Sequence, residues 1–265
     1  SPSPTCSKSS RSSWSPLPNY GATNAVGSVG RLQVIDLDGA GPEGPSLLAL
    51  PDGSSQMFTV GGTALNRLGR FDGSTWSALN GGLSDLHVNL GGDPTNQGNV
   101  HCAAMFDSGG GLQLHVGGWF THLDGQVKRR IVRWNGSAWE EGGGGVGPET
   151  VGWDFDRVYD MAVFNDGSGE ALYACGTFTR AGTATVSNIA RWNGSAWSDV
   201  GGGVSGGSGA IRAAVVFNDG SGPALYVAGS FTTAGAATVG NVARWNGTAW
   251  SAVGTGFNNE VLALH

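Results

Sequence analysis

Three different side chains occupy one recurring position of this chain, and their types could bind a ligand. His101, Tyr159 and Arg212 each follow an apolar residue in three similar segments, and Leu262 has the corresponding place in a fourth. Imidazole, phenol and guanidinium groups donate hydrogen bonds, and Arg also attracts anions. Because these residues vary while their neighbours stay apolar, the pattern predicts an asymmetric ligand-binding surface.

A short acidic segment is a candidate calcium site. Asp36-x-Asp38-Gly39-x-Gly41, with Glu43 nearby, offers closely spaced carboxylates, and calcium takes oxygen ligands. The later acid of the integrin-type calcium loop is absent. Calcium at Asp36 and Asp38 is therefore a candidate cofactor of this segment, and otherwise we expect no cofactor.

His101, His115 and His122 lie close together in the sequence and could form a transition-metal site. A hairpin with His115 opposite Ala103 would place it on the same face as His101. Tyr226 occupies the position of His115 in a sister segment, which favours a packing role over metal binding.

Motifs typical of enzymes match this sequence in residue type and spacing but lack the structural context that they require. Residues 142–147 and 201–206 have the Gly-x-Gly-x-x-Gly spacing of a dinucleotide fingerprint, which requires a helix after the turn. Residues 203–207 match a nucleophile elbow, which requires an α/β context. No acid–base pair or nucleophile set recurs. We therefore expect a non-catalytic protein, with a hydrolase or lyase as the less favoured alternative.

The composition excludes several classes of protein. The 48 glycines among 265 residues are more than twice the usual ~7% but follow no three-residue period, which excludes collagen. Charged residues are 13% and aromatic residues 9%, which argues against disorder. The net charge of −6 makes nucleic acid an unfavourable partner. No stretch has the ~18 consecutive apolar residues of a membrane-spanning helix, so we expect no membrane insertion.

Tandem repeats must position the candidate residues. The phrase Arg-Trp-Asn-Gly-Ser/Thr-Ala-Trp begins at Arg133, Arg191 and Arg244, with variants beginning at Arg70 and Lys8. The repeated Arg could form an anion-binding ring, but we expect it to stack on aromatics or bind loop carbonyls. The Asn-Gly steps of this phrase predict tight hairpin turns.

Each repeat is expected to form four short antiparallel strands. In the last repeat these are Ile211–Phe217, Ala224–Phe231, Asn241–Trp245 and a strand around Trp250. An Asn-Asp-Gly-Ser-Gly turn joins the first two. Four antiparallel strands in tandem repeats of this size are typical of β-propeller blades.

The repeat also resembles a known family. Its consensus runs from Phe-Asn-Asp-Gly-Ser-Gly through Ala-Leu-Tyr-x-x-Gly-x-Phe-Thr-x-Ala-Gly to Asn-x-Ala-Arg-Trp-Asn-Gly-x-Ala-Trp. This is similar to the kelch-like propeller repeats of large secreted bacterial proteins, from Trp14 onward. The resemblance implies a propeller with a binding or scaffolding role for a protein or glycan ligand, outside the cell or at its surface.

We therefore predict an all-β fold: a β-propeller of four-stranded antiparallel blades, four complete and a partial fifth formed from the two chain ends. The expected ranges are 1–17 for the partial blade, 18–79, 80–142, 143–200 and 201–253 for blades 1 to 4, and 254–265 for the start of the next. Either a five-bladed ring or a fragment of a larger array fits this pattern. In blade 1 we expect the first hairpin over 47–61, with Arg31–Leu37 as an extra strand or loop.

In a propeller the first strand of each blade lines the central channel, so His101, Tyr159 and Arg212 would lie at the channel mouth. A carbohydrate-binding propeller is the alternative function. In that case Trp134, Trp192 and Trp245 would face solvent between blades and stack on sugar rings, giving several weak sites and avidity. Burial of these indoles between blades would instead favour a scaffold.

Overall fold

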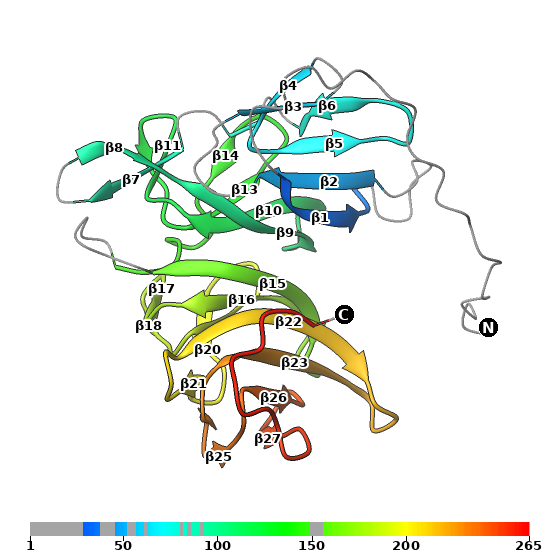
Figure 1. Ribbon diagram of the computed structural model, residues 1–265, viewed down its shortest axis with the longest axis vertical. Coiled ribbons are helices and arrows are strands. Elements are labelled where there is room, and N and C mark those ends of the chain that lie inside the picture. The colour runs from blue at the N-terminus through cyan, green and yellow to red at the C-terminus, as the bar shows by residue number, and fades with distance from the viewer. Residues whose placement is uncertain are drawn as a thin grey trace.

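The computed structural model describes residues 29–37, 46–51, 57–60, 63–79, 82–83, 86–90, 93–148 and 156–264. These residues form an all-β protein built from small antiparallel sheets. Four of the sheets follow one another along the chain and correspond to the sequence repeats, and we number them repeat sheets 1 to 4 (Figure 1). Among the described residues no helix is long and apolar enough to cross a membrane.

Each repeat sheet has four strands in chain order. Repeat sheet 1 contains β1 (Val29–Ile35), β2 (Ser46–Pro51), β5 (Gly69–Phe71) and β6 (Trp76–Ala78). Repeat sheet 2 contains β9 (Asn99–Asp107), β10 (Leu112–Trp119), β13 (Ile131–Trp134) and β14 (Trp139–Glu140). Repeat sheet 3 contains β15 (Arg157–Asn165), β16 (Glu170–Thr177), β19 (Ile189–Trp192) and β20 (Trp197–Asp199). Repeat sheet 4 contains β22 (Ala210–Asn218), β23 (Pro223–Ser230), β26 (Val242–Trp245) and β27 (Trp250–Ala252).

A short hairpin is inserted between the second and third strands of every repeat sheet. These hairpins are β3 (Met57–Val60) with β4 (Thr63–Asn66), β11 (His122–Leu123) with β12 (Gln126–Val127), β17 (Arg180–Ala181) with β18 (Ala184–Thr185), and β24 (Thr233–Ala234) with β25 (Ala237–Thr238). Strand β7 (His87–Leu90) joins β11 to β8 (Asp93–Gln97), and β21 (Val204–Ser205) pairs with β24.

The strand prediction is confirmed for repeat sheet 4 and wrong for repeat sheet 1. Strand β1, which covers most of the expected extra segment, is the first strand and pairs with β2. Residues 57–66 form the inserted hairpin instead of the second strand. The polar residues Arg31 and Gln33 make β1 look like a loop, but Gln33 Nε2 donates to Ala103 O of β9 at 2.7 Å.

Three hydrophobic clusters lie between successive repeat sheets, and a smaller fourth cluster of Ala49 and Leu65 lies at repeat sheet 1. Between sheets 1 and 2, Leu48 and Leu50 pack against Leu114 and Val116. Between sheets 2 and 3, Cys102 and Ile131 pack with Val158 and Leu172. Between sheets 3 and 4, Tyr173 and Ile189 pack with Leu225 and Val227. The first strands β1, β9, β15 and β22 make contact in this order (Figure 1). Sheet-on-sheet packing is therefore repeated along the chain.

In repeat sheets 2, 3 and 4, the Trp of the fourth strand hydrogen-bonds to the loop that connects its sheet to the preceding one. The indole N–H groups donate to loop carbonyls 50 to 57 residues earlier, from Trp139 to Gly82 O at 3.2 Å, from Trp197 to Gly142 O at 3.1 Å and from Trp250 to Val200 O at 2.8 Å. The Gly-rich loops are packed tightly. Gly143 has φ +59°, and a Cβ there would overlap the Trp192 ring.

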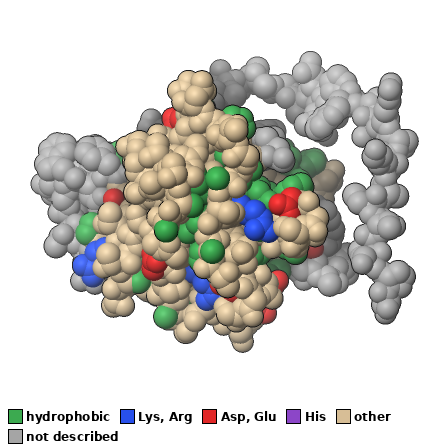
Figure 2. All heavy atoms as spheres, turned by 90° about the horizontal axis from the view of Figure 1, so that it is seen from below, with side chains coloured by type: hydrophobic (Ala, Val, Ile, Leu, Met, Phe, Trp, Pro, Cys, Tyr) green, Lys and Arg blue, Asp and Glu red, His purple; other side chains and the backbone are tan. Residues whose placement is uncertain are grey.

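A second recurring residue ties each sheet to the loop that follows it. Four residues that precede the third strand have φ between 54° and 66°, a region unusual for non-glycine residues. Their side chains donate from Arg67 to Leu83 O at 3.1 Å, from Arg130 to Val146 O at 3.0 Å, from Asn188 to Val204 O at 3.0 Å and from Asn241 to Phe257 O at 2.9 Å. On the face shown in Figure 2, charged side chains are scattered and gather in no single patch.

Candidate ligand-binding site

The first strand of every repeat sheet contains a β-bulge at the same place. The pairing register skips His101 in β9, Tyr159 in β15 and Arg212 in β22, and shifts at the equivalent place, Gly30, in β1. A bulged residue has no cross-strand partner, and the bulge redirects its side chain. The three residues that vary in the sequence are therefore the ones released from the regular alternation of the strand.

In repeat sheets 2, 3 and 4 a glycine lies opposite the bulge, whereas repeat sheet 1 has Pro51 at this place. A Cβ at Gly118, Gly176 or Gly229 would overlap the carbonyl oxygen two residues before the bulge, on Asn99, Arg157 or Ala210 respectively. No side chain fits where a neighbouring backbone comes this close. In these three sheets the close approach of the bulged backbone therefore requires glycine near the end of the second strand.

The three bulged side chains form one continuous row across repeat sheets 2, 3 and 4, which we call the binding row. The His101 ring stacks on the Tyr159 ring with centroids 5.3 Å apart and planes inclined by 17°. The Arg212 guanidinium carbon lies 4.3 Å from the centroid of the Tyr159 ring. All three side chains are partly exposed. The structure therefore brings together the three residues that the sequence singled out, although they lie more than 50 positions apart.

One proton of the row can be assigned. His101 Nδ1 lies 3.1 Å from the carbonyl oxygen of Val158, and a carbonyl only accepts, so Nδ1 carries the hydrogen. Burial lowers the pKa of His101, and the nearby Arg157, Arg212 and Arg31 lower it further. The ring is neutral at pH 7, which leaves Nε2 as a hydrogen-bond acceptor.

A carboxylate ends the row. Glu260 Oε1 lies 2.7 Å from Arg212 Nε, with the two side chains 36% and 30% exposed. The next residue, Val261, donates its backbone N–H to Gly229 O at 2.9 Å. Leu262, which has the recurring position in the sequence, is 70% exposed and does not extend the row.

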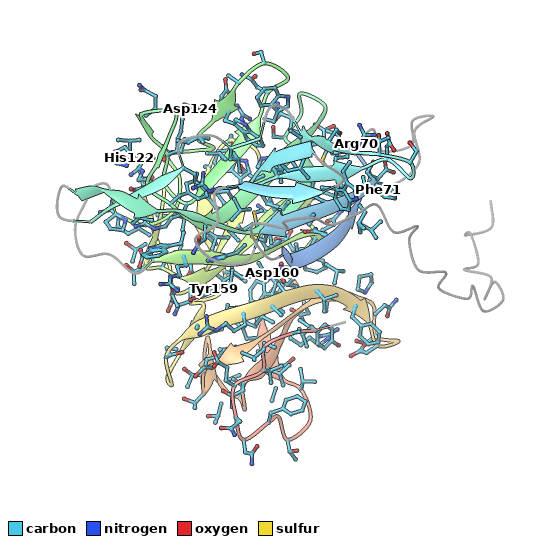
Figure 3. All side chains as sticks on the ribbon, turned by 45° about the horizontal axis from the view of Figure 1, so that its top comes forward. Arg70, Phe71, His122, Asp124, Tyr159 and Asp160 are labelled. Carbon is cyan, nitrogen blue, oxygen red and sulfur yellow. The ribbon has the colours of Figure 1, made fainter. Side chains whose placement is uncertain are left out.

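An ion pair lies directly beside the row, at Asp160 next to Tyr159 (Figure 3). Asp160 Oδ1 lies 3.0 Å from Arg31 Nη2, and the aspartate also accepts backbone N–H bonds from Met161 at 3.0 Å and Ala214 at 2.9 Å. Burial raises the pKa of Asp160, while Arg31 and these two N–H groups oppose that rise. One carboxylate thus connects repeat sheets 1, 3 and 4 beneath the binding row.

The surroundings of the row suit binding better than covalent chemistry. The Arg157 guanidinium carbon lies 4.5 Å from the centroid of the Trp119 ring, so the site has two Arg–aromatic pairs and three nearby arginines. The closest thiol, Cys102, is fully buried, and burial raises its pKa well above the usual value, which keeps it protonated and unreactive. The available groups are planar faces, cations and a neutral imidazole acceptor.

The tryptophans proposed for sugar stacking do not present free faces. Trp192 is 3% exposed and Trp245 is 7% exposed, and both lie in the clusters between sheets. Trp134 is partly buried and packs edge-on against Trp139, with centroids 5.3 Å apart. The expectation that these indoles face solvent is therefore wrong for Trp192 and Trp245. Burying a large apolar ring between two sheets stabilises the fold more than leaving the ring in water.

The repeated arginines do not form an open anion-binding ring. Arg191 Nε lies 2.7 Å from Asp166 Oδ2, and Arg244 Nε lies 3.6 Å from Asp219 Oδ2. Arg133 has Glu140 as its partner at 3.1 Å. These guanidinium groups bind acidic side chains of their own sheets, and Arg191 Nη2 also donates to the loop carbonyl of Gly169 at 3.4 Å, as expected.

Among the described residues, the candidate metal ligands are not grouped into a site. Asp36 is exposed at the end of β1, and Asp38 lies outside the described residues. His115 faces Ala104 instead of Ala103, because the hairpin pairs Leu112 with Asp107; its ring packs against Phe106 at 5.8 Å. In the part of the chain that the structure describes, no three His, Cys, Asp or Glu residues are grouped to hold a metal.

Sequence reasoning missed Arg31, Arg157, Asp160 and Glu260. Arg31 and Asp160 each follow a bulge position directly, and Glu260 precedes the recurring position by two residues. Aligning the residues on both sides of the varying position would have drawn attention to them. Their partners, however, come from other sheets and are not indicated by spacing.

Comparisons with known proteins give no relative for this chain. No protein-family model matches it, and no curated protein or solved structure shows significant similarity to it. The repeats can be compared with one another, and that comparison separates what recurs in every sheet from what changes at the binding row.

Proposed function

We propose that this protein is a non-catalytic ligand-binding module, a kelch-like β-propeller whose ligand is held at the binding row. One observation carries the proposal: the same bulged position in three successive sheets holds three different side chains, and these stack into a single partly exposed row. Packing alone favours similar residues at equivalent places of a repeat, as the clusters between sheets illustrate.

The internal packing supports a propeller. Successive sheets share a hydrophobic cluster at each junction, as blades around an axis do. Phe217 of repeat sheet 4 is 56% exposed, whereas Phe106 and Phe164 at the equivalent place of sheets 2 and 3 are 2% and 4% exposed. A further sheet packed on sheet 4 would bury Phe217, as a closed ring requires. An experimental structure with β1, β9, β15 and β22 away from a common axis would overturn this part of the proposal.

The chemistry of the row supports binding over catalysis. Planar rings and guanidinium groups recognise ligands by stacking and charge, and the row contains no activated nucleophile. The tryptophan-based carbohydrate alternative loses support because Trp192 and Trp245 are buried. By resemblance to secreted kelch-like repeats, we place the protein outside the cell or at its surface.

A binding screen with matched variants tests the function. Wild type, Tyr159→Ala, Arg212→Ala and the control Arg180→Ala would be assayed against immobilised peptide and glycan panels. Arg180 is an exposed arginine of the β17–β18 hairpin and is not a member of the row. We expect a ligand that wild type and Arg180→Ala bind alike and that the two row variants bind at least tenfold more weakly. Binding that is indifferent to both row variants, or turnover of a panel member, would contradict the proposal.

A further inference from the structure

An Arg–Trp pair lies beside the binding row, where repeat sheets 2 and 3 meet. Trp119 is the last residue of β10 and Arg157 is the first residue of β15, and the guanidinium carbon lies 4.5 Å from the centroid of the indole ring. Both side chains are partly exposed. Arg157 precedes the bulged Tyr159 by two residues, and the carbonyl between them, on Val158, accepts the N–H of His101 at 3.1 Å. The pair is therefore an immediate neighbour of the row.

This pair departs from the repeat, as the row itself does. At the junction of sheets 3 and 4, the places of Trp119 and Arg157 are taken by Thr177 and Ala210. Neither of these residues is aromatic or charged, although the strand registers of the three sheets are the same. Small residues thus suffice for packing at that junction, which favours a recognition role for the larger pair.

Arg157 has unused capacity to donate hydrogen bonds. Arg157, Arg212 and Arg31 all lie close enough to His101 to lower its pKa, and Arg31 and Arg212 each contact a carboxylate, at 3.0 Å and 2.7 Å. Within the described chain Arg157 pairs with no carboxylate, and its Nε is buried without an acceptor. Stacking uses the face of a guanidinium and leaves the N–H groups in its plane to bind a ligand.

The groups around the row include many hydrogen-bond donors and few acceptors. Arg157 and Arg212 only donate, and the buried indole N–H of Trp119 has no acceptor among the described residues. The neutral His101 ring offers one acceptor, Nε2. A ligand that suits these groups is negatively charged and rich in oxygen acceptors. A peptide brings one N–H donor per residue, and because the row runs from sheet to sheet, a peptide lying along it could not pair with a strand edge.

We propose that Arg157, stacked on Trp119, binds the carboxylate of a uronic acid residue, and that the ligand of the binding row is an acidic glycan. The inference rests on the proposed function and names its ligand class. A guanidinium donates two parallel N–H bonds to a carboxylate, and a hydroxyl of the same sugar can donate to His101 Nε2. This site is separate from Trp192 and Trp245, which are buried between sheets.

Uronate oligosaccharides test the inference on the full chain. Fluorescently labelled oligogalacturonate, oligoalginate and hyaluronan oligosaccharides would be titrated by anisotropy, each beside its methyl ester, which keeps the sugar and removes the charge. We expect at least one uronate to bind, and its ester to bind at least tenfold more weakly.

Variants at Arg157 locate the carboxylate. Arg157→Gln should weaken uronate binding at least tenfold, and Arg157→Lys threefold to tenfold, because lysine keeps the charge but loses the planar fork. The matched control Arg180→Gln, on the β17–β18 hairpin, should bind like wild type. Thermal melts followed by circular dichroism would verify that each variant is folded.

Four results would overturn the inference. If no uronate binds, or if the ester binds as tightly as the acid, the carboxylate is not recognised. If a sulfated glycan or poly-glutamate binds more tightly than every uronate, the ligand belongs to another class. Equal uronate binding by wild type and Arg157→Gln would show that Arg157 does not contact the carboxylate. If the panel ligand still requires Tyr159 and Arg212 in any of these cases, the proposed function stands and only the glycan inference fails.

Discussion

The two ends of β15 and β22 follow opposite rules. At the hairpin end the two sheets are nearly identical: Tyr173 donates to Asp166 Oδ2 at 2.9 Å, and Tyr226 donates to Asp219 Oδ2 at 2.7 Å. At the bulged end the corresponding residues are Tyr159, a neutral phenol, and Arg212, a cation. The strand register is the same in sheets 3 and 4, so at the bulge these two sheets differ in side chain and not in backbone pairing.

Repeat sheet 2 shows that even the hairpin network tolerates replacement. His115 takes the place of the tyrosine, and Ser108 takes that of the aspartate. Its arginine, Arg133, then pairs with Glu140 on the neighbouring strand at 3.1 Å. The recurring requirement is a partner for the arginine, whereas the bulged end has no recurring partner. We therefore assign the hairpin end to folding stability and the bulged end to ligand recognition.

The largest expected effect is on the bulge itself. Gly176→Ala would place a methyl group on the Arg157 carbonyl oxygen, and we expect it to destabilise the protein by about 3 kcal/mol or more. Gly167→Ala is the control at the hairpin end, where φ is +96° but no atom lies within 4 Å of the added Cβ; about 1 kcal/mol is expected. Urea unfolding measures both. Equal losses of unfolding free energy in the two variants would show that the position opposite the bulge does not require glycine for steric reasons.

The ion pair beneath the row comes next. Asp160→Ala leaves Arg31 and the Ala214 N–H without their carboxylate, and we expect a loss of about 2 to 3 kcal/mol, the lower part of the range for buried pairs because Arg31 is 39% exposed. Glu170→Ala, at the exposed first position of β16, should change stability by less than about 0.5 kcal/mol. A loss from Asp160→Ala no larger than that would mean that Asp160 does not connect the sheets.

The hairpin networks of sheets 3 and 4 can be compared directly. Arg191→Gln removes a pair whose side chains are 15% and 10% exposed, and about 1 kcal/mol of stability should be lost. Arg244→Gln should cost less, because its aspartate is 39% exposed and lies 3.6 Å away. Chemical denaturation of the two variants gives the order. The reverse order would indicate that burial does not set the strength of these pairs.

The smallest expected effect is on the pH dependence of stability, which should have opposite signs for Asp166 at the hairpin end and Asp160 at the bulged end. Burial alone would raise the pKa of Asp166, but bonds from Ser168, Tyr173 and Arg191 lower it to about 2. Its stabilisation is therefore present above the ordinary aspartate pKa and is lost as pH falls toward 2. Relative to Asp166→Asn, wild type should lose stability between pH 4 and about 2.

Asp160 supplies the contrasting measurement. Burial raises its pKa, so its contribution is complete below the ordinary aspartate pKa and is lost as pH rises through the folded value. Relative to Asp160→Asn, wild type should gain stability as pH falls from neutral toward 4. If wild type changed stability in the same direction relative to Asp166→Asn and to Asp160→Asn as pH falls, the opposite pKa shifts of the two aspartates would be wrong.

The local structure was largely readable from sequence. The Asn-Gly turns form as expected: Asn193 Oδ1 accepts the N–H groups of Ser195 and Ala196 at 2.9 Å, and Gly194 has φ +97°. The varying residues His101, Tyr159 and Arg212 were also found, because a regular repeat makes an exception visible. Strand β1 was expected only as an extra strand or loop, and not as the first strand of its sheet, because its polar residues contact other sheets and give no apolar alternation.

The sequence by itself determined the turns, the four-strand repeat and the position at which the repeats differ, because turn geometry and strand patterning depend on residues a few positions apart. Only the tertiary structure decided that Trp192 and Trp245 are buried, that Arg31 meets Asp160, and that three bulged residues stack into one row. Those contacts join strands more than 50 residues apart, and they exist only once neighbouring sheets pack face to face.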